Sequence, residues 1–118
     1  MTGFARLFKF YVPPGQQQAY DAYLRDVVTP IDAAAHASGV FESLITITPR
    51  RPGDWNHGRL FTFANEAQRE AFAGRMAGAA MGFDGSEAAR DARKAHAETL
   101  RTLIGSEDYD FTDPHGLK

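Results

Sequence analysis

The apolar side chains of this sequence recur in some segments at the two-residue step of a strand and in others at the three- to four-residue step of a helix. The order of these segments limits the possible folds. Residues 4–12 are rich in aromatic and β-branched side chains and end at a Pro-Pro-Gly run at 13–15, which predicts a strand and a turn. Residues 16–37 have helical spacing, so we expect a long helix that ends at Gly39. Pro30 lies inside this helix and should kink or interrupt it one or two residues earlier, because proline lacks an N–H group.

The second half of the chain adds further helical segments. Asn65 should cap the first of them, with Gln68 as its partner in a capping box. Its continuation, Gly74–Gly85, is rich in glycine and should be weak or mobile; it could serve as a lid or allow close helix packing. Ser86 should cap the next helix. The other predicted elements are a strand over 41–48, a hairpin connection over 49–58, a strand over 59–64, a helix over 87–104 and an edge strand over 107–112 that stops at Asp113-Pro114.

The resulting order, β-α-β-β-α-(α)-β, is that of a ferredoxin-like split βαβ fold. It belongs to the α+β class and has a four-stranded antiparallel sheet with its helices on one face. A chain of 118 residues suits one domain, because this length can enclose a single core. We expect that domain to have its core at about residues 4–112 and a polar tail at 113–118.

The strands predict a sheet that is apolar on both faces. Its more apolar face should lie against the helices. The other face is too apolar for solvent, and a second copy of the same sheet would cover it. We therefore expect a homodimer that closes into a dimeric α+β barrel around a small cavity. The helix-facing residues should be Phe8, Phe10, Ile45, Ile47, Phe61 and Phe63, and the opposite face should carry Leu7, Lys9, Tyr11, Glu42, Leu44, Thr46, Leu60, Thr62 and Ala64.

Composition excludes several classes of function. The net charge is −2, and no basic stripe could neutralise a phosphate backbone, so we expect no nucleic-acid partner. The absence of cysteine excludes disulfides, thiolate metal sites and cysteine nucleophiles. The four histidines lack metal-ligand spacing, and we predict neither a metal nor a cofactor. No signal peptide or membrane-spanning run is present, so the expected location is cytoplasmic, with no membrane partner.

Three stretches resemble the NIPSNAP-like branch of the dimeric α+β barrel superfamily, within a similarity of layout over roughly residues 4–112. They are Tyr11-Val12-Pro13-Pro14-Gly15, the block Leu60–Glu70 (LFTFANEAQRE) and Leu100-Arg101-Thr102-Leu103-Ile104. The resemblance implies a homodimer with a small-molecule pocket. Related branches include cofactor-free monooxygenases, haem-degrading enzymes and proteins of unknown role. The resemblance assigns no site residue.

Five residues are candidates for ligand contacts: Lys9, Tyr11, Glu42, Thr62 and Met76. Lys9, Tyr11, Glu42 and Thr62 share the face expected to line the barrel, where a few polar groups in an apolar cavity are typical of a ligand site. A buried lysine or tyrosine there could stabilise an enolate or a phenolate. Met76 belongs to the adaptable glycine-rich segment. The stronger alternative is that Lys9 and Glu42 form an ion pair in the dimer and Tyr11 only packs.

Trp55, Asn56, His57 and Arg59 form a second cluster, at the hairpin connection. Haem-degrading barrel enzymes use Asn, Trp and His, but there these residues come from separate elements. Adjacency in one hairpin instead favours a turn with an exposed aromatic side chain. His57 could either cap strand ends or act as a base.

These observations predict a protein that binds a small, largely apolar organic molecule between its sheet and its helices, with an unknown reaction. One alternative is a cofactor-independent monooxygenase of the antibiotic-biosynthesis type. Another is a non-catalytic structural or partner-binding dimer, whose cavity would be filled with side chains.

Overall fold

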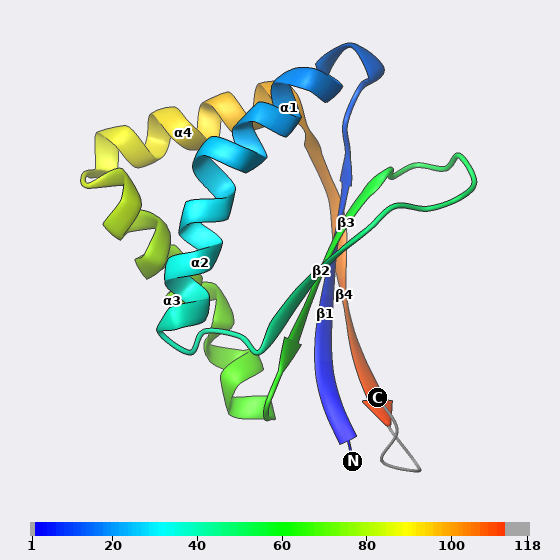
Figure 1. Cartoon of the computed structure of the whole chain (residues 1–118), viewed down its shortest axis with the longest axis vertical. Helices are drawn as coiled ribbons and strands as arrows, with labels where there is room; N and C mark the ends of the chain where they lie inside the picture. Colours follow the sequence, from blue (N-terminus) through cyan, green and yellow to red (C-terminus); the bar gives the residue numbers. More distant parts are fainter. Residues whose placement is uncertain (1, 113–118) are drawn as a thin grey trace.

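The computed structural model describes residues 2–112, which form one sheet covered on one side by helices (Figure 1). The predicted tail at 113–118, with its stop at Asp113-Pro114, lies outside the described residues. The elements are β1 (Thr2–Tyr11), a 3₁₀ turn (Pro14–Gln16), α1 (Gln17–Tyr23), a π-helical turn (Leu24–Val28), α2 (Thr29–Ala37), β2 (Ser43–Ile47), β3 (His57–Phe63), α3 (Glu66–Asp84), α4 (Glu87–Leu100) and β4 (Thr102–Thr112).

The sheet has four strands in the order β2-β3-β1-β4, and all neighbouring strands are antiparallel. At its centre, Leu7 lies opposite Leu60 of β3 and opposite Glu107 of β4. The register between β1 and β4 shifts between Lys9 and Phe10, which marks a bulge. The predicted α+β class with a ferredoxin-like fold is therefore confirmed, with one helix added before β4.

The first helical run is continuous from Gln17 to Ala37 but widens in its middle. The N–H of Thr29 donates to the carbonyl of Leu24, five residues back, which makes this turn π-helical. Pro30 falls in the first turn of α2, where a missing N–H does least harm. The predicted kink or interruption near Pro30 therefore takes the form of a π-helical turn in an unbroken run, and Gly39 follows the helix with φ 79°.

The third helix is longer and more regular than the sequence predicts. The side chain of Asn65 accepts a hydrogen bond from the N–H of Gln68, whose own side chain accepts one from the N–H of Ala64, so the predicted cap is confirmed. The helix then continues without a break to Gly85, where φ is 81°. Close packing at its interior glycines is contradicted, because a side chain would meet nothing within 4 Å at Gly74, Gly78 or Gly82.

The last helix ends earlier than predicted. It stops at Leu100, and Arg101 is already extended, with φ −152° and ψ 157°. Leu103 and Ile104 continue the apolar helical spacing, but both lie in β4, which pairs along β1. The predicted helix over 87–104 is therefore wrong at its end, and the final strand begins at Thr102.

One strand also contradicts the predicted faces of the sheet. Leu44 lies opposite Phe61 and packs against the helix-facing core, whereas Ile45 lies opposite Leu60. Because directly opposed residues of antiparallel strands share a face, Ile45 and Ile47 point away from the helices. Both faces of this strand are apolar, so the sequence held no signal to choose between them. For the other strands the prediction is confirmed by the helix-facing packing of Phe8, Phe61 and Phe63.

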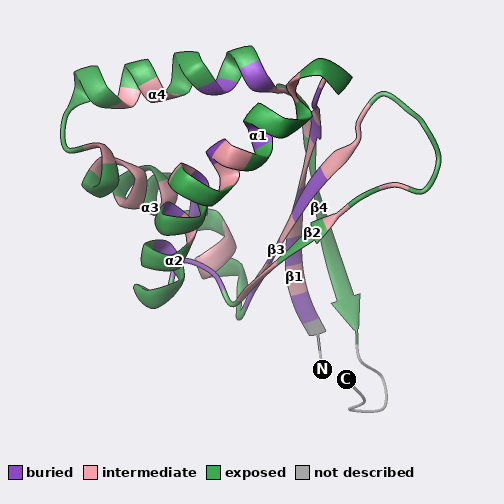
Figure 2. Cartoon of the chain, turned by 45° about the horizontal axis from the view of Figure 1, so that its top comes forward, coloured by how far each residue is buried: buried purple, intermediate pink, exposed green. Residues whose placement is uncertain are grey.

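Buried side chains form two clusters between the sheet and the helices. Figure 2 marks the buried positions along the ribbon. The first cluster joins the end of β1 to the first helical run and α4, and the second joins the end of α2 to β3 and α3. Solvent-facing sides of the helices are exposed in the same view. The first cluster contains Val12, Tyr20, Tyr23, Val28, Ala97 and Leu100, and the second contains Ala35, Val40, Phe41, Phe61, Phe63 and Phe72.

Candidate functional site

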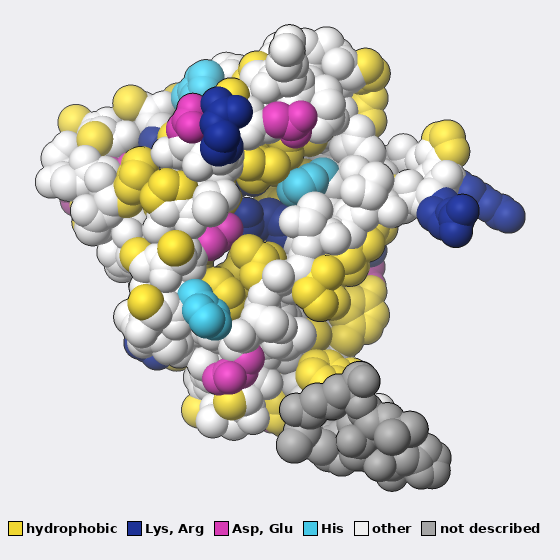
Figure 3. Space-filling view, viewed as in Figure 1, with side chains coloured by type: hydrophobic (Ala, Val, Ile, Leu, Met, Phe, Trp, Pro, Cys, Tyr) yellow, Lys and Arg dark blue, Asp and Glu magenta, His cyan; other side chains and the backbone are white. Residues whose placement is uncertain are grey.

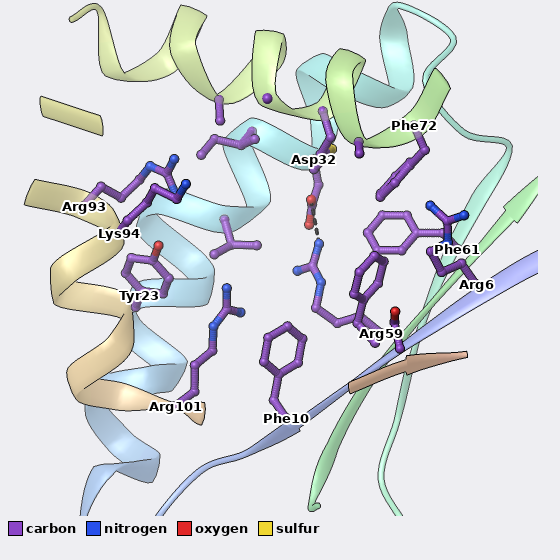
Figure 4. A pocket seen from close by; sticks show the side chains of 18 of the residues that line it. Arg6, Phe10, Tyr23, Asp32, Arg59, Phe61, Phe72, Arg93, Lys94 and Arg101 are labelled. Atoms are coloured by element: carbon purple, nitrogen blue, oxygen red, sulfur yellow. Dashed lines mark hydrogen bonds and ion pairs between the residues drawn. The ribbon is translucent and has the colours of Figure 1, made fainter. Parts of the chain in front are cut away.

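A cavity of about 780 Å³ lies between the sheet and the helices (Figure 4). Members of both core clusters line it: Tyr23 and Val28 come from the first cluster, and Phe61 and Phe72 come from the second. The clusters therefore pack the two ends of the layer and leave its middle open. The volume falls within the range of pockets that hold small organic molecules.

Aromatic rings form one wall of this cavity. Phe8 and Phe10 both face the helices because they are two residues apart on β1, and Phe61 joins them from β3. The rings of Phe61 and Phe72 are 4.7 Å apart, and Phe8 lies 5.8 Å from Phe61 in an edge-on arrangement. Met76 of α3 adds a flexible apolar side chain to the lining. The wall can therefore stack against a flat hydrophobic molecule.

A buried ion pair crosses the layer beside this wall. Asp32 of α2 accepts a hydrogen bond of 2.7 Å from Arg59 of β3 (Figure 4). Their side chains are only 13% and 10% exposed, and the guanidinium also lies 5.2 Å from the ring of Phe61. The pair thus joins helix to sheet at a largely buried position, where breaking it would leave an uncompensated charge.

A second cavity of about 560 Å³ lies on the other side of the ion pair. It shares Val28, Asp32 and Arg59 with the first cavity and is also lined by His36 and Glu42. Figure 3 shows a hollow between the helices and the sheet, with basic and acidic side chains at its bottom. The ion pair therefore separates two openings into the same layer.

Six basic side chains line the main cavity, and four of them have acidic partners. The partnered arginines hold Asp108, Asp32, Asp91 and Asp84, so their charges are locally neutralised. The pairs are Arg6–Asp108 at 2.7 Å, Arg59–Asp32 at 2.7 Å, Arg90–Asp91 at 3.2 Å and Arg93–Asp84 at 2.9 Å. The other two, Lys94 and Arg101, form no ion pair within residues 2–112.

Arg101 is held in place by aromatic rings. Its guanidinium lies 4.2 Å from the ring centroid of Phe10 and 6.0 Å from that of Tyr23. It donates a hydrogen bond of 3.1 Å to the hydroxyl of Tyr20. Figure 4 shows the side chain reaching into the cavity between Tyr23 and Phe10. The geometry leaves a positioned cation at one end of the aromatic wall.

His57 lies at the start of β3 among aromatic rings. Its ring meets Tyr20 edge-on at 5.1 Å and lies 6.3 Å from Phe10. Its Nε2 is buried and has no hydrogen-bond partner among the described residues. Burial, followed by the nearby charges of Arg59 and Arg101, lowers the pKa of His57 from its usual 6.5 to about 4. The ring is therefore neutral at pH 7 and is a weak base there.

The five predicted contact residues do not come together. Met76 lines the main cavity, and Glu42 lines the second one from an exposed position. Lys9 lies on the opposite face of the sheet. Within the described chain its side chain forms an ion pair with Glu107 and not with Glu42. Thr62 lies on the same face as Lys9, and its hydroxyl forms a hydrogen bond with the hydroxyl of Ser43. Tyr11 is half-buried at the end of β1, opposite Thr102.

The hairpin cluster has a structural role in the described chain. Asn56 accepts a hydrogen bond of 2.8 Å from the N–H of Val12 and donates one of 2.7 Å to the carbonyl of the same residue. Trp55 packs near Gly58 and lies 5.9 Å from the Lys9 ammonium. The predicted turn is present, but its aromatic side chain is half-buried rather than exposed, because Trp55 packs over Gly58.

The sequence did contain a signal for Arg6 and Asp32, which were missed, and for the role of Arg59, which was assigned only to the hairpin cluster. Arg6 and Arg59 occupy positions two residues before phenylalanines, on the most apolar face of two paired strands. Asp32 lies one residue after Ile31 in the apolar helical stripe. A charged residue on an apolar face is unusual unless it is paired, and this is the pattern that marks the site.

Two further properties concern the whole described chain. None of its helices has both the length and the hydropathy needed to cross a bilayer. Across residues 2–112, no three histidine, aspartate or glutamate side chains gather in an arrangement that could hold a metal ion.

Comparison with solved structures shows which proteins share this fold. A NIPSNAP family protein from Agrobacterium tumefaciens has a TM-score of 0.58 at 17% identity, covering 99% of this chain and 98% of its own. A dabb family protein with a ferredoxin-like fold from Mesorhizobium loti has a TM-score of 0.53 at 11% identity, covering 96% and 98%. A putative antibiotic biosynthesis monooxygenase from Chloroflexus aurantiacus has a TM-score of 0.50 at 14% identity, covering 98% and 99%.

No protein-family model and no curated protein matches the sequence. Identities below 20% in these three structures establish shape rather than activity. The chain has the ferredoxin-like fold of these proteins over nearly its whole length, and its resemblance to the NIPSNAP-like branch is confirmed at the level of that fold.

Proposed function

We propose that this protein binds a small, largely apolar organic molecule in the cavity between its sheet and its helices, and that it does so as a homodimer. The aromatic wall formed by Phe8, Phe10, Phe61 and Phe72 beside an open space of about 780 Å³ carries the proposal. Phe10, Phe61 and Phe72 are already buried, whereas Phe8 is half-buried at the edge of this space, so a hydrophobic ligand would bury further apolar surface there.

A cavity-filling substitution tests the binding site. N-phenyl-1-naphthylamine, a neutral fluorescent probe, should bind with saturation at one molecule per chain. Ala80 is half-buried on α3 and lines the cavity, so Ala80→Phe should weaken probe binding at least about 10-fold by occupying the space. Ala71→Phe, at an exposed position of the same helix outside the lining, is the matched control and should bind normally. Absence of saturable binding, or equal binding by both variants, would contradict the proposal.

The dimer is proposed from the bare face of the sheet. Ile45, Tyr109 and Phe111 are 51%, 43% and 46% exposed on the face opposite the helices, around Leu7 and Leu60. These apolar side chains share the face with the Lys9–Glu107 pair and the hydroxyls of Ser43 and Thr62, and a second copy of the same face would match it in size and polarity and cover its apolar part.

A charge placed on this face should separate the protomers. Phe111→Lys should convert the dimer to a monomer, because each protomer would have to bury a lysine in the interface. Phe83 is equally exposed, at 46%, but lies on α3, so Phe83→Lys is the control and should remain dimeric. Native mass spectrometry reports the subunit count of each variant. A monomeric wild type at all concentrations would refute the homodimer.

A cofactor-independent monooxygenase reaction is the second candidate. The observation that favours it is a fold shared with the Chloroflexus protein, combined with an aromatic cavity that would shield an oxidation-sensitive substrate from water. Protein-dependent consumption of oxygen with an electron-rich aromatic substrate would support it. Ala80→Phe should abolish that consumption. If the wild type consumes oxygen no faster than the protein-free solution, the monooxygenase proposal is refuted and only the binding proposal remains.

A further inference from the structure

We infer that the ligand is an apolar acid, a flat hydrophobic molecule with one anionic oxygen group, and that Arg101 and Lys94 bind that group. This inference rests on the proposed function, because it names the class of molecule that the same cavity would take. It is carried by the distribution of charge around the cavity and by the position of Arg101.

The charges lining the cavity do not balance. Six cations line it, against only two carboxylates, those of Asp32 and Asp108. Asp84 and Asp91 neutralise two more of the arginines from outside the lining. Two cations, Arg101 and Lys94, then remain without a carboxylate in the described chain. A ligand with one negative charge would neutralise one of these two cations, whereas a cationic ligand would be repelled.

Helix α4 directs this charge into the cavity. Arg90, Lys94 and Arg101 are four and seven residues apart, so they follow one stripe of α4 and its first extended residue. The same stripe includes Ala97, which is buried in the first core cluster. Packing of that alanine fixes the rotation of the helix, and this rotation turns the basic side chains toward the cavity.

Arg101 is positioned to meet an anion at the edge of a stacked molecule. One face of its guanidinium is held against the ring of Phe10 at 4.2 Å, which restricts the long side chain before a ligand arrives. Within residues 2–112, only one of its five side-chain N–H groups is used, by the hydroxyl of Tyr20. The remaining donors can make a two-bond contact with a carboxylate, in surroundings where such bonds are stronger than in water.

The apolar wall and the cation lie next to each other. Phe10 belongs to both, since it lines the cavity with Phe8 and Phe61 and also supports Arg101. A hydrophobic body stacked on the wall would therefore place a substituent at its rim within reach of the guanidinium. Lys94, on the opposite side of Tyr23 in Figure 4, would add a second, more mobile charge.

Two probes with the same aromatic skeleton separate this inference from the proposed function. N-phenyl-1-naphthylamine is neutral, and 8-anilino-1-naphthalenesulfonate carries one sulfonate on that skeleton. The wild type should bind the sulfonate probe about 10-fold or more tightly than the neutral one, the effect of one charge-assisted hydrogen bond. In Arg101→Gln the ratio of the two affinities should fall toward 1, and in Arg101→Lys part of it should return.

The controls make each result decisive. Arg25→Gln removes one exposed positive charge outside the cavity and should keep the wild-type ratio. Circular dichroism checks that Arg101→Gln is folded. If it is not, Lys94→Gln is used instead, because Lys94 is exposed, and the ratio of the two probe affinities should fall about 3-fold. A ratio that is equal in the wild type and the variants would overturn the inference while leaving the proposed function in place. If neither probe binds, both fail together.

Discussion

Acid should destabilise this protein through His57, which the fold keeps neutral. In the unfolded chain the pKa of this histidine returns to about 6.5, whereas burial holds it at about 4 in the folded chain. Between these two values the unfolded state binds more protons than the folded state, so the free energy of unfolding falls as the pH falls. This contribution is complete above pH 6.5 and is lost as the pH approaches 4.

The magnitude follows from the same two values. Between pH 7 and pH 5, linkage gives an upper limit of about 2 kcal/mol for the loss of unfolding free energy. Because the ring of His57 is only partly buried, solvent reduces this effect, and we expect about 1 kcal/mol. His57→Phe keeps an aromatic ring between Tyr20 and Phe10 and removes the buried Nε2, so it should lack this part of the pH dependence.

Urea unfolding followed by circular dichroism, at pH 7 and pH 5 and at one protein concentration, measures the difference for wild type and variant. The fixed concentration matters because dissociation of a dimer would otherwise add to the result. An NMR titration of the His57 ring provides an independent midpoint, expected near pH 4. Parallel losses of stability in both proteins, or a midpoint near 6.5, would refute the reasoning.

Three further substitutions have expected outcomes in equilibrium unfolding. Gly78→Ala should stabilise the protein by about 1 kcal/mol, because the position is helical and exposed and a Cβ would meet nothing within 4 Å; a loss of stability would show that α3 needs the glycine. Arg59→Met should cost about 3–5 kcal/mol by leaving the largely buried Asp32 unpaired, and the double variant with Asp32→Leu should recover most of that loss; a double variant as unstable as the single one would contradict this account. Asn56→Ala should cost about 2 kcal/mol, since two hydrogen bonds to the backbone of Val12 are removed, and an unchanged midpoint would contradict that role.

The sequence predicted the order of elements well because turn and cap residues are local signals. The cap at Asn65, the glycine after α2 and the irregular turn before Pro30 all depend on a few neighbouring residues. The end of α4 was not predictable in this way. Leu103 and Ile104 suit a helical stripe equally well, and only pairing with β1, far away in the sequence, places them in a strand.

The site was harder to predict than the fold, for a physical reason. The polar candidates Lys9 and Thr62 were chosen because they interrupt the semi-apolar face of the sheet, yet each already has a partner on that face. The cavity instead lies on the more apolar face, where polar groups are rarer and therefore more informative. Its charged pair joins Asp32 to Arg59 across 27 positions of sequence, and no spacing rule connects two such residues.

The charged residues of the aromatic face also bear on the choice between a binding protein and a purely structural dimer. An apolar pair of similar size at positions 32 and 59 would close the layer at equal or higher stability, because burying two charges costs several kcal/mol before they attract each other. The ion pair spans the gap between α2 and β3 and leaves open space on both of its sides. Arg101 adds a cation that no carboxylate of the described chain neutralises, at the border of the same space. A layer that served only to pack would gain nothing from this arrangement, whereas a layer that receives an apolar acid would use the aromatic wall, the open middle and the unbalanced charge.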